Sequence, residues 1–168
     1  MKAVTFFRLL ATVFMVTAVG AIGGLACNIG AEEAFTEFYV LGPDGRVEGY
    51  PAEFIIQEGR VILVKYGDGR DDEVAGGSGT VILEVVNRER EEATYLLTIT
   101  IDGQPVTVDG SSSGEVEMMT LAHEEVWRRE IGLVPQHIGD GQRVDFALLK
   151  DGAAYLELYI LIDVRNAG

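Results

Sequence analysis

The stretch VDFALLKDGAAYLELYILIDV, residues 144–164, decides the fold, because apolar side chains alternate along it on both sides of an Asp-Gly turn. In its first half, Val144, Phe146 and Leu148 share one face of an extended chain. In its second half, one face holds Leu156, Leu158, Ile160, Ile162 and Val164, and the other holds Tyr155, Glu157, Tyr159, Leu161 and Asp163. A period of two predicts a pair of strands that each turn one face toward a core.

The same period extends outward along the chain. TYLLTITID at 94–102 places Tyr95, Leu97, Ile99 and Ile101 on one face, and GTVILEVVN at 79–87 does so with Val81, Leu83 and Val85. The predicted strands cover 35–41, 46–50, 53–57, 60–66, 79–87, 93–102, 104–109, 115–121, 126–134, 142–150 and 155–164. Short strands with turn signals between them indicate an all-β fold, an immunoglobulin-like two-sheet β-sandwich.

Two polar stretches lie between these strands. The charged run REREEA at 88–93 is typical of a solvated hairpin tip. HEEVWRRE at 123–130 is interpreted as a turn that leads into a strand, and Trp127 in that strand is expected to be at least half buried. In the competing interpretation, Trp127 is an exposed aromatic residue at a partner surface.

The length, charge and cysteine content of the chain limit the classes of function that it can have. The chain has 168 residues, which fits one domain, and 27 Asp and Glu against 13 Lys and Arg, with a net charge of −14. This acidity argues against a nucleic-acid partner, because phosphate binding requires clustered Lys and Arg. A single cysteine excludes a disulfide framework within the chain.

The N-terminus predicts a membrane segment. Lys2 and Arg8 are the only charges before Glu32, and residues 9–31 carry none. At about 1.5 Å per residue, a helix over that run would reach across a hydrocarbon core of about 30 Å. The leading positive charges predict a cytoplasmic N-terminus, with residues 1–31 as stub and transmembrane helix and 32–168 as an extracytoplasmic domain. Membrane lipid is then the first expected partner, and the cell membrane the expected location.

Three interpretations of this segment stay open. It is a retained signal anchor, a cleaved signal peptide with small-residue sites near Ala21 and Ala26, or a lipoprotein leader modified at Cys27. The length of the run favours the anchor, because apolar cores of cleaved signals are only about 7–15 residues long.

Metal-binding candidates lie in one acidic loop, GDGRDDEVAGGSG at 67–79. Its carboxylates could supply oxygen ligands to calcium, and the sequence suggests no other cofactor. The order of residues differs from the known calcium loops, and Arg70 interrupts it, so a solvated acidic loop is the competing interpretation. The candidate ligands are Asp68, Asp71, Asp72 and Glu73. His123 and His137 are expected to be exposed polar residues rather than zinc ligands.

A partner-binding surface is predicted around the turn in EFYVLGPDGRVEGYP, residues 37–51. Aromatic side chains are enriched at interfaces, and this stretch supplies Phe38, Tyr39, Tyr50 and Pro51. In the alternative interpretation these residues are covered within the domain, in part by a hairpin at 54–66.

The chain also resembles the domain of unknown function 1616 family of archaeal and some bacterial membrane proteins. The stretches that carry the resemblance are FTEFYVLGPDGRVEGYP at 35–51, GTVILEVVNRE at 79–89, ATYLLTITIDG at 93–103, LAHEEVWRREIGLVP at 121–135 and GDGQRVDFALLKDGAAYLELYILIDV at 139–164. The resemblance implies a membrane-tethered, externally facing β domain and brings no catalytic residues with it. This chain departs from the family in having one N-terminal membrane segment instead of several, and in a longer segment from Phe54 to Ser78.

Three functional classes remain. The leading one is a non-catalytic interaction module that docks on a membrane complex or on neighbouring copies of itself. The second is a surface module that binds a glycan, a small ligand or calcium. The third is a cell-envelope enzyme, which would require carboxylates or a histidine to converge in a cleft.

Overall fold

The computed structural model describes residues 33–67, 79–108 and 113–167. The chain divides into two units, Met1–Glu33 and Ala34–Gly168, and the second contains all the described strands. The predicted membrane segment at 9–31 and Cys27 lie outside the described residues. Among the residues that are described, no helix is long and apolar enough to cross a membrane.

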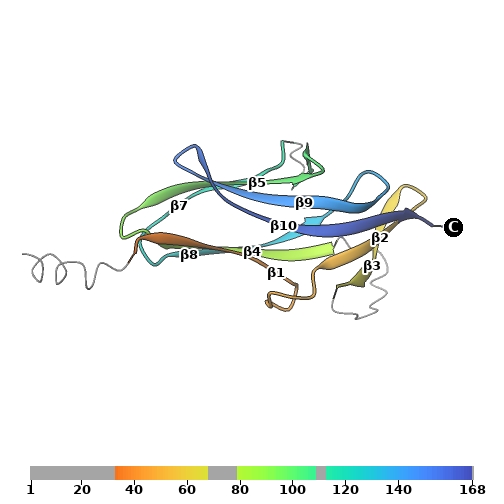
Figure 1. Ribbon diagram of the computed structural model, residues 1–168, viewed down its shortest axis with the longest axis horizontal. Coiled ribbons are helices and arrows are strands. Elements are labelled where there is room, and N and C mark those ends of the chain that lie inside the picture. The colour runs from red at the N-terminus through yellow and green to blue at the C-terminus, as the bar shows by residue number, and fades with distance from the viewer. Residues whose placement is uncertain (1–32, 68–78, 109–112, 168) are drawn as a thin grey trace, which may run out of the picture. The chain divides into compact units, whose positions relative to one another are not determined.

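In the described part of the chain, ten strands form two sheets, and Figure 1 shows their arrangement. The three-stranded sheet has the order β1-β4-β8, with β1 at Phe35–Leu41, β4 at Gly79–Arg88 and β8 at Val126–Leu133. The seven-stranded sheet has the order β3-β2-β10-β9-β5-β6, and β7 also pairs with β5. Its strands are β2 (Pro51–Gln57), β3 (Arg60–Tyr66), β5 (Ala93–Ile101), β6 (Gln104–Pro105), β7 (Glu115–Leu121), β9 (Gly139–Lys150) and β10 (Ala153–Asn166). The prediction of an all-β fold with two sheets is confirmed.

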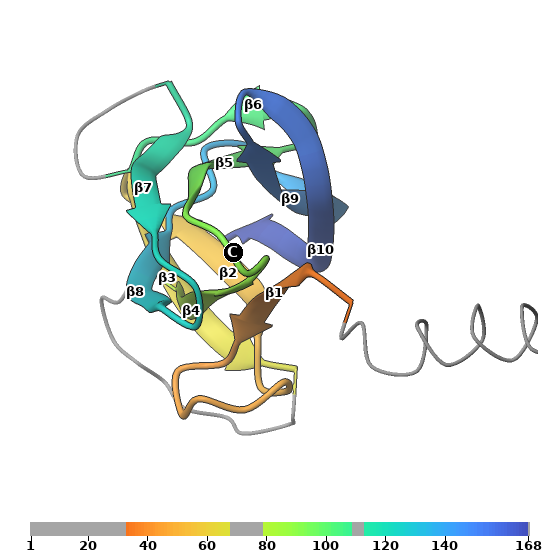
Figure 2. The ribbon, with the colours of Figure 1, turned by 90° about the vertical axis from the view of Figure 1, so that its left-hand side faces the viewer.

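The core lies between the two sheets, whose strands are arranged around it in the view of Figure 2. The inner faces predicted from alternation in β5, β9 and β10 are the faces that point into it. In β5 and β9, Leu97, Phe146 and Leu148 are fully buried. From the smaller sheet, Val81, Leu83 and Val85 of β4 reach the same core and are also fully buried. Burial of these apolar side chains is the main favourable contribution to folding.

Trp127 is half-buried in β8 and packs against the core, which confirms its expected burial. The stretch at 123–130 is a turn that leads into β8, also as expected.

Two predicted strands differ from the structure. Residues 46–50 belong to the connection between β1 and β2, where Gly42 N–H donates to Arg46 C=O and Gly45 N–H donates to Gly42 C=O. Gly45 and Gly49 have positive φ angles there, which interrupts an extended chain. The predicted strand at 104–109 is reduced to β6, Gln104–Pro105.

The prediction of a hairpin tip at 88–93 is wrong. β4 lies in the three-stranded sheet and β5 in the seven-stranded sheet, so the charged run crosses from one layer to the other. Asn87, which is fully buried, fixes the start of this crossing, because its Nδ2 donates to the backbone oxygens of Glu91 and Leu121. Sequence alternation identifies strands and faces, but not the sheet that each strand joins.

Of the longer segment from Phe54 to Ser78, residues 54–66 belong to the β2–β3 hairpin, with Glu58 and Gly59 at its turn, and residues 68–78 lie outside the described residues. β2 also pairs with β10, in parallel and only along Asp163–Asn166 of that strand. Phe54 is fully buried, and Pro51 and Phe54 pack closely over the start of β4, where a Cβ at Gly79 would lie 2.5–2.6 Å from them.

Candidate functional site

The outer face of β9 and β10 carries large apolar side chains in contact with solvent. Tyr159 is 59% exposed and Leu161 57%, on the face opposite the core. Exposed apolar groups that lie together on a folded surface mark interaction sites more often than scattered ones do. This face is therefore the first candidate for a functional site.

Arg143 organises this face. Its guanidinium carbon lies 4.5 Å from the centroid of the Tyr159 ring, its Nε contacts Asp145 Oδ1, and its Nη2 contacts Glu157 Oε1, both at 2.5 Å. Strand register places Tyr159 opposite Asp145 and Leu161 opposite Arg143. We call these five residues, Arg143, Asp145, Glu157, Tyr159 and Leu161, the β10 outer patch. Because two carboxylates hold the arginine, the tyrosine ring stays positioned, and ordering it on contact costs little entropy.

The residues predicted to bind a partner occupy different environments. Phe38 is 8% exposed and belongs to the core, and Pro51 is buried beside Gly79. Tyr39 points outward from β1, is 37% exposed, and donates from its hydroxyl to Glu37 Oε2 at 3.1 Å. Tyr50 is half-buried and packs against the core. The structure thus leaves Tyr39 as the exposed member of the set.

The two tyrosines also differ in their chemistry. Tyr50 donates to the backbone oxygen of Val40 at 2.9 Å, which ties the start of β2 to β1, and burial raises its pKa. The hydrogen bond with Glu37 raises the pKa of Tyr39. Both phenols are therefore protonated at neutral pH and can donate hydrogen bonds.

A second cluster, which sequence analysis missed, surrounds Glu89 in the crossing between the sheets. Its carboxylate accepts hydrogen bonds from Thr36 Oγ1 (2.8 Å) and Tyr155 OH (2.7 Å), and its Oε2 lies 2.8 Å from Lys150 Nζ. Tyr95 OH lies 2.7 Å from Thr36 Oγ1. Thr36 comes from the smaller sheet, whereas Tyr95, Lys150 and Tyr155 come from the larger one. One carboxylate therefore links both layers.

Glu89 and Lys150 stabilise each other's charged form. Burial alone would raise the pKa of Glu89, but hydrogen bonds from Lys150, Tyr155 and Thr36 outweigh it and lower the pKa. The hydrogen bond to Glu89 raises the pKa of Lys150. Both groups therefore remain ionised, although the side chain of Glu89 is only 9% exposed and that of Lys150 only 20% exposed. The arrangement is satisfied internally, and its chemistry is that of a structural ion pair.

The predicted calcium ligands Asp68, Asp71, Asp72 and Glu73 lie outside the described residues. Within the described ranges, no group of three or more His, Cys, Asp or Glu side chains is arranged to hold a metal ion. His123 and His137 are exposed, as expected, and lie at opposite ends of β8. The Nδ1 atom of His123 accepts a hydrogen bond from the Arg90 backbone at 3.2 Å.

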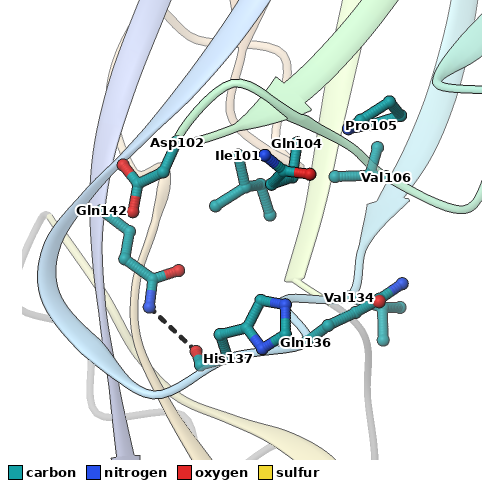
Figure 3. Close-up of a pocket in the computed structure, with 9 residues that line it drawn as sticks. All are labelled: Ile101, Asp102, Gln104, Pro105, Val106, Val134, Gln136, His137 and Gln142. Atoms are coloured by element: carbon teal, nitrogen blue, oxygen red, sulfur yellow. Dashed lines mark hydrogen bonds between the residues drawn. The ribbon is translucent and has the colours of Figure 1, made fainter.

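A small pocket lies where the β5–β6 turn meets the chain before β9, as Figure 3 shows. Its volume is about 70 Å³, far below the roughly 300–1,000 Å³ of typical ligand pockets. Gln142 donates to the backbone oxygen of His137 at 2.8 Å along one wall. The lining residues are Ile101, Asp102, Gln104, Pro105, Val106, Val134, Gln136, His137 and Gln142.

Comparison with known families adds the identification. The family model "Domain of unknown function (DUF1616)" matches residues 64–163, which is more than half of the chain. The chain belongs to this family. The matched range of this DUF1616 member covers β4 to β9 and most of β10, and so includes the β10 outer patch. It leaves out FTEFYVLGPDGRVEGYP at 35–51, the stretch that opens the resemblance in sequence.

Comparison with individual proteins is less informative for this DUF1616 member. No curated protein matches it. Among solved structures, it is similar to the FixG-related protein from Vibrio parahaemolyticus, with 16% identity, a TM-score of 0.43, and coverage of 77% of this chain and 95% of that one. It is also similar to the beta-D-glucoside glucohydrolase from Trichoderma reesei, with 11% identity, a TM-score of 0.32, and coverage of 79% of this chain. The chain spans only 19% of that glucohydrolase.

Proposed function

We propose that this protein is a membrane-anchored, extracytoplasmic interaction module, a non-catalytic subunit that docks on a protein partner in a membrane complex. The observation that carries the proposal is the β10 outer patch. Tyrosine and arginine are the residues most enriched at the energetic centres of protein interfaces, and here they are stacked and exposed together.

The charged groups of the patch also suit a specific contact. Arg143 is paired with both Asp145 and Glu157, so a partner that covers these groups meets one excess negative charge rather than three unpaired charges. Tyr159 and Leu161 supply the apolar area. The patch resembles the centre of a non-obligate interface, in which apolar groups lie among satisfied polar ones.

Anchoring is the second part of the proposal and rests on sequence. The uncharged run at 9–31, with Lys2 and Arg8 before it, supports a membrane segment with the domain outside the cytoplasm. Beyond that run the chain has 11 Lys and Arg against 27 Asp and Glu, a net charge of −16.

The strand order supports an immunoglobulin-like assignment of the sandwich. β1, β4 and β8 correspond to strands A, B and E of that fold, and β5, β9 and β10 to strands C, F and G. β2, which pairs with β10 in parallel, follows β1 in the chain and joins the opposite sheet. Domains of this architecture are common in cell-surface proteins.

The proposal is tested by recovering the tagged full-length chain from its native membranes in mild detergent. We expect a protein partner to co-purify with the unaltered chain and to be lost from the Tyr159→Ser/Leu161→Ser double variant. Met118→Ser is the matched control, because Met118 is 72% exposed on β7, at the far side of the same sheet. Recovery of the chain alone, or equal recovery of partner with the double variant, would contradict the proposal.

A further inference from the structure

Part of β10 has an unpaired edge. On one side, β9 pairs with β10 along nearly its whole length. On the other side, β2 begins to pair only at Asp163. Within the described part of the chain, no strand pairs with the stretch Leu156–Ile162 on that side.

The backbone groups that face this edge can be identified. Arg143 C=O accepts from Asp102 N–H and Asp151 N–H donates to Thr94 C=O, so the odd-numbered residues of β9 direct their backbone groups toward β5. The even-numbered residues therefore face β10, where Phe146 is opposite Leu158 and Val144 opposite Ile160. Leu158 and Ile160 consequently bond to β9, and the N–H and C=O groups of Glu157, Tyr159 and Leu161 point to the open edge.

The core beneath this edge is also incompletely covered. Leu156 and Leu158 point inward, yet each is only partly buried. Their neighbours across the ladder, Leu148 and Phe146, are fully buried. Among the described residues, this edge combines unpaired backbone groups with half-covered inward leucines, which is the arrangement that one further strand would complete.

We infer that an extended segment of a partner protein adds to the sheet along the Leu156–Ile162 edge of β10, with apolar side chains inward and basic ones outward. The backbone groups define the extended conformation, because they are satisfied by another main chain. Because Leu156 and Leu158 are apolar and only partly buried, the inward side chains of the added segment are expected to be apolar. The net charge of −16 beyond the membrane run, with the Glu157 side chain 57% exposed beside the edge, favours basic outward positions.

A second copy fits the edge less well. Antiparallel pairing of β10 with itself about Tyr159 would set residues 163–166 of one copy opposite residues 152–155 of the other. Residues 163–166 of the first copy already pair with β2 on that edge. The chain of the second copy would therefore clash with β2. A single extended segment without its own sheet meets no such obstacle.

This inference rests on the proposed function and names the way in which the partner binds.

The probe is a short, capped peptide with the repeat Lys-Val-Thr-Val, labelled so that its binding to the full-length protein in detergent is measured by fluorescence anisotropy. Two further peptides carry N-methyl groups on alternate amides, one on the valines and one on the lysines and threonines. We expect the unmodified peptide and one methylated isomer to bind, and the other isomer to bind at least about tenfold more weakly, because it cannot donate to β10.

The protein is varied at Tyr159. Tyr159→Pro removes one edge-facing N–H without removing a bond to β9, and Tyr159→Ala keeps that N–H but removes the same side chain. We expect the peptide to bind about tenfold more weakly to the proline variant than to the alanine variant, with both melting temperatures within a few degrees of each other.

Several results would overturn the inference. Strand addition is excluded if both methylated peptides bind equally, if the peptide binds both variants equally, or if the unmodified peptide does not bind. A full-length protein that forms a dimer, and whose dimer is dissociated by Tyr159→Pro, would show that a second copy occupies the edge. If both the proline and the alanine variant recover less partner from native membranes than the unaltered chain does, and to the same extent, strand addition fails while the interaction function stands.

Discussion

At the scale of single residues, Glu89 makes the most consequential contacts outside the apolar core. It stands in a run of charged residues, REREEA, that looks uniformly solvated in sequence. In the structure its carboxylate is held by Thr36, Lys150 and Tyr155, whereas Glu91 and Glu92 in the same run are exposed. One glutamate of the run therefore joins the two sheets, and the others remain at the surface.

Glu89→Gln is expected to lower the free energy of unfolding by about 1–3 kcal/mol, because it leaves Lys150 partly buried without its counter-charge. Glu92→Gln is the control and should change stability by less than about 0.5 kcal/mol. Urea unfolding of the full-length protein in detergent measures both. Equal, small effects of the two substitutions would show that the Glu89 cluster does not stabilise the fold.

The same cluster predicts a pH dependence. The folded-state pKa of Glu89 is lowered, so its contribution is fully present above the unfolded-state pKa of about 4.3 and is lost as pH falls through the folded value. The pKa of Lys150 is raised, so the pair also weakens as pH rises above about 10.4. The stability difference between the wild type and Glu89→Gln should therefore shrink in acid. A difference that stays constant down to about pH 2 would contradict this account.

At the scale of elements, β10 shows what alternation determines. Its inward residues, predicted from sequence, are those that face the core, and its outward residues include Tyr159 and Leu161, the exposed apolar pair of the outer patch. The neighbours Leu161 and Ile162 point to opposite sides of one strand, at 57% and 1% exposure. They therefore form a matched pair for substitution.

Ile162→Ser is expected to destabilise the protein by about 3–5 kcal/mol, because it creates a cavity and buries a hydroxyl. Leu161→Ser should change stability by less than about 0.5 kcal/mol, since its side chain is already in water. Thermal or urea unfolding of the two full-length variants distinguishes them. A large loss from Leu161→Ser would show that the outer patch is covered within the chain and is not a docking surface.

The sequence predicts the positions of the strands better than it predicts which strands pair with one another. Most strand ranges and the inner faces of β5, β9 and β10 follow from a local period of two, which the chain carries within each segment. The sheet that β4 or β5 joins depends on contacts distant in sequence, so the local pattern at 88–93 predicts a hairpin tip where the structure has a crossing between the sheets. For the same reason, the stacking of Arg143 on Tyr159 depends on register between strands. The outward Tyr155, Tyr159 and Leu161 were the signal that could have pointed to this face.

At the scale of the whole molecule, we propose that an anchoring segment carries a two-sheet domain with an exposed docking face. The proposed docking face belongs to the range that the DUF1616 family model matches, and the uncharged run at 9–31, the proposed anchor, precedes that range in sequence. An interaction module of this kind requires that the described domain be displayed on the outer side of the membrane, where an extracytoplasmic partner can reach β10.

Display of the domain is tested most directly by thiol labelling on intact cells. Cys27 is replaced by alanine, and Met118, which is 72% exposed on β7, by cysteine, so that the single thiol lies in the described domain. The account predicts that a membrane-impermeant maleimide labels the Met118→Cys chain in intact cells and that the chain stays in the membrane fraction. Labelling only after the cells are permeabilised would place the domain in the cytoplasm and contradict the account.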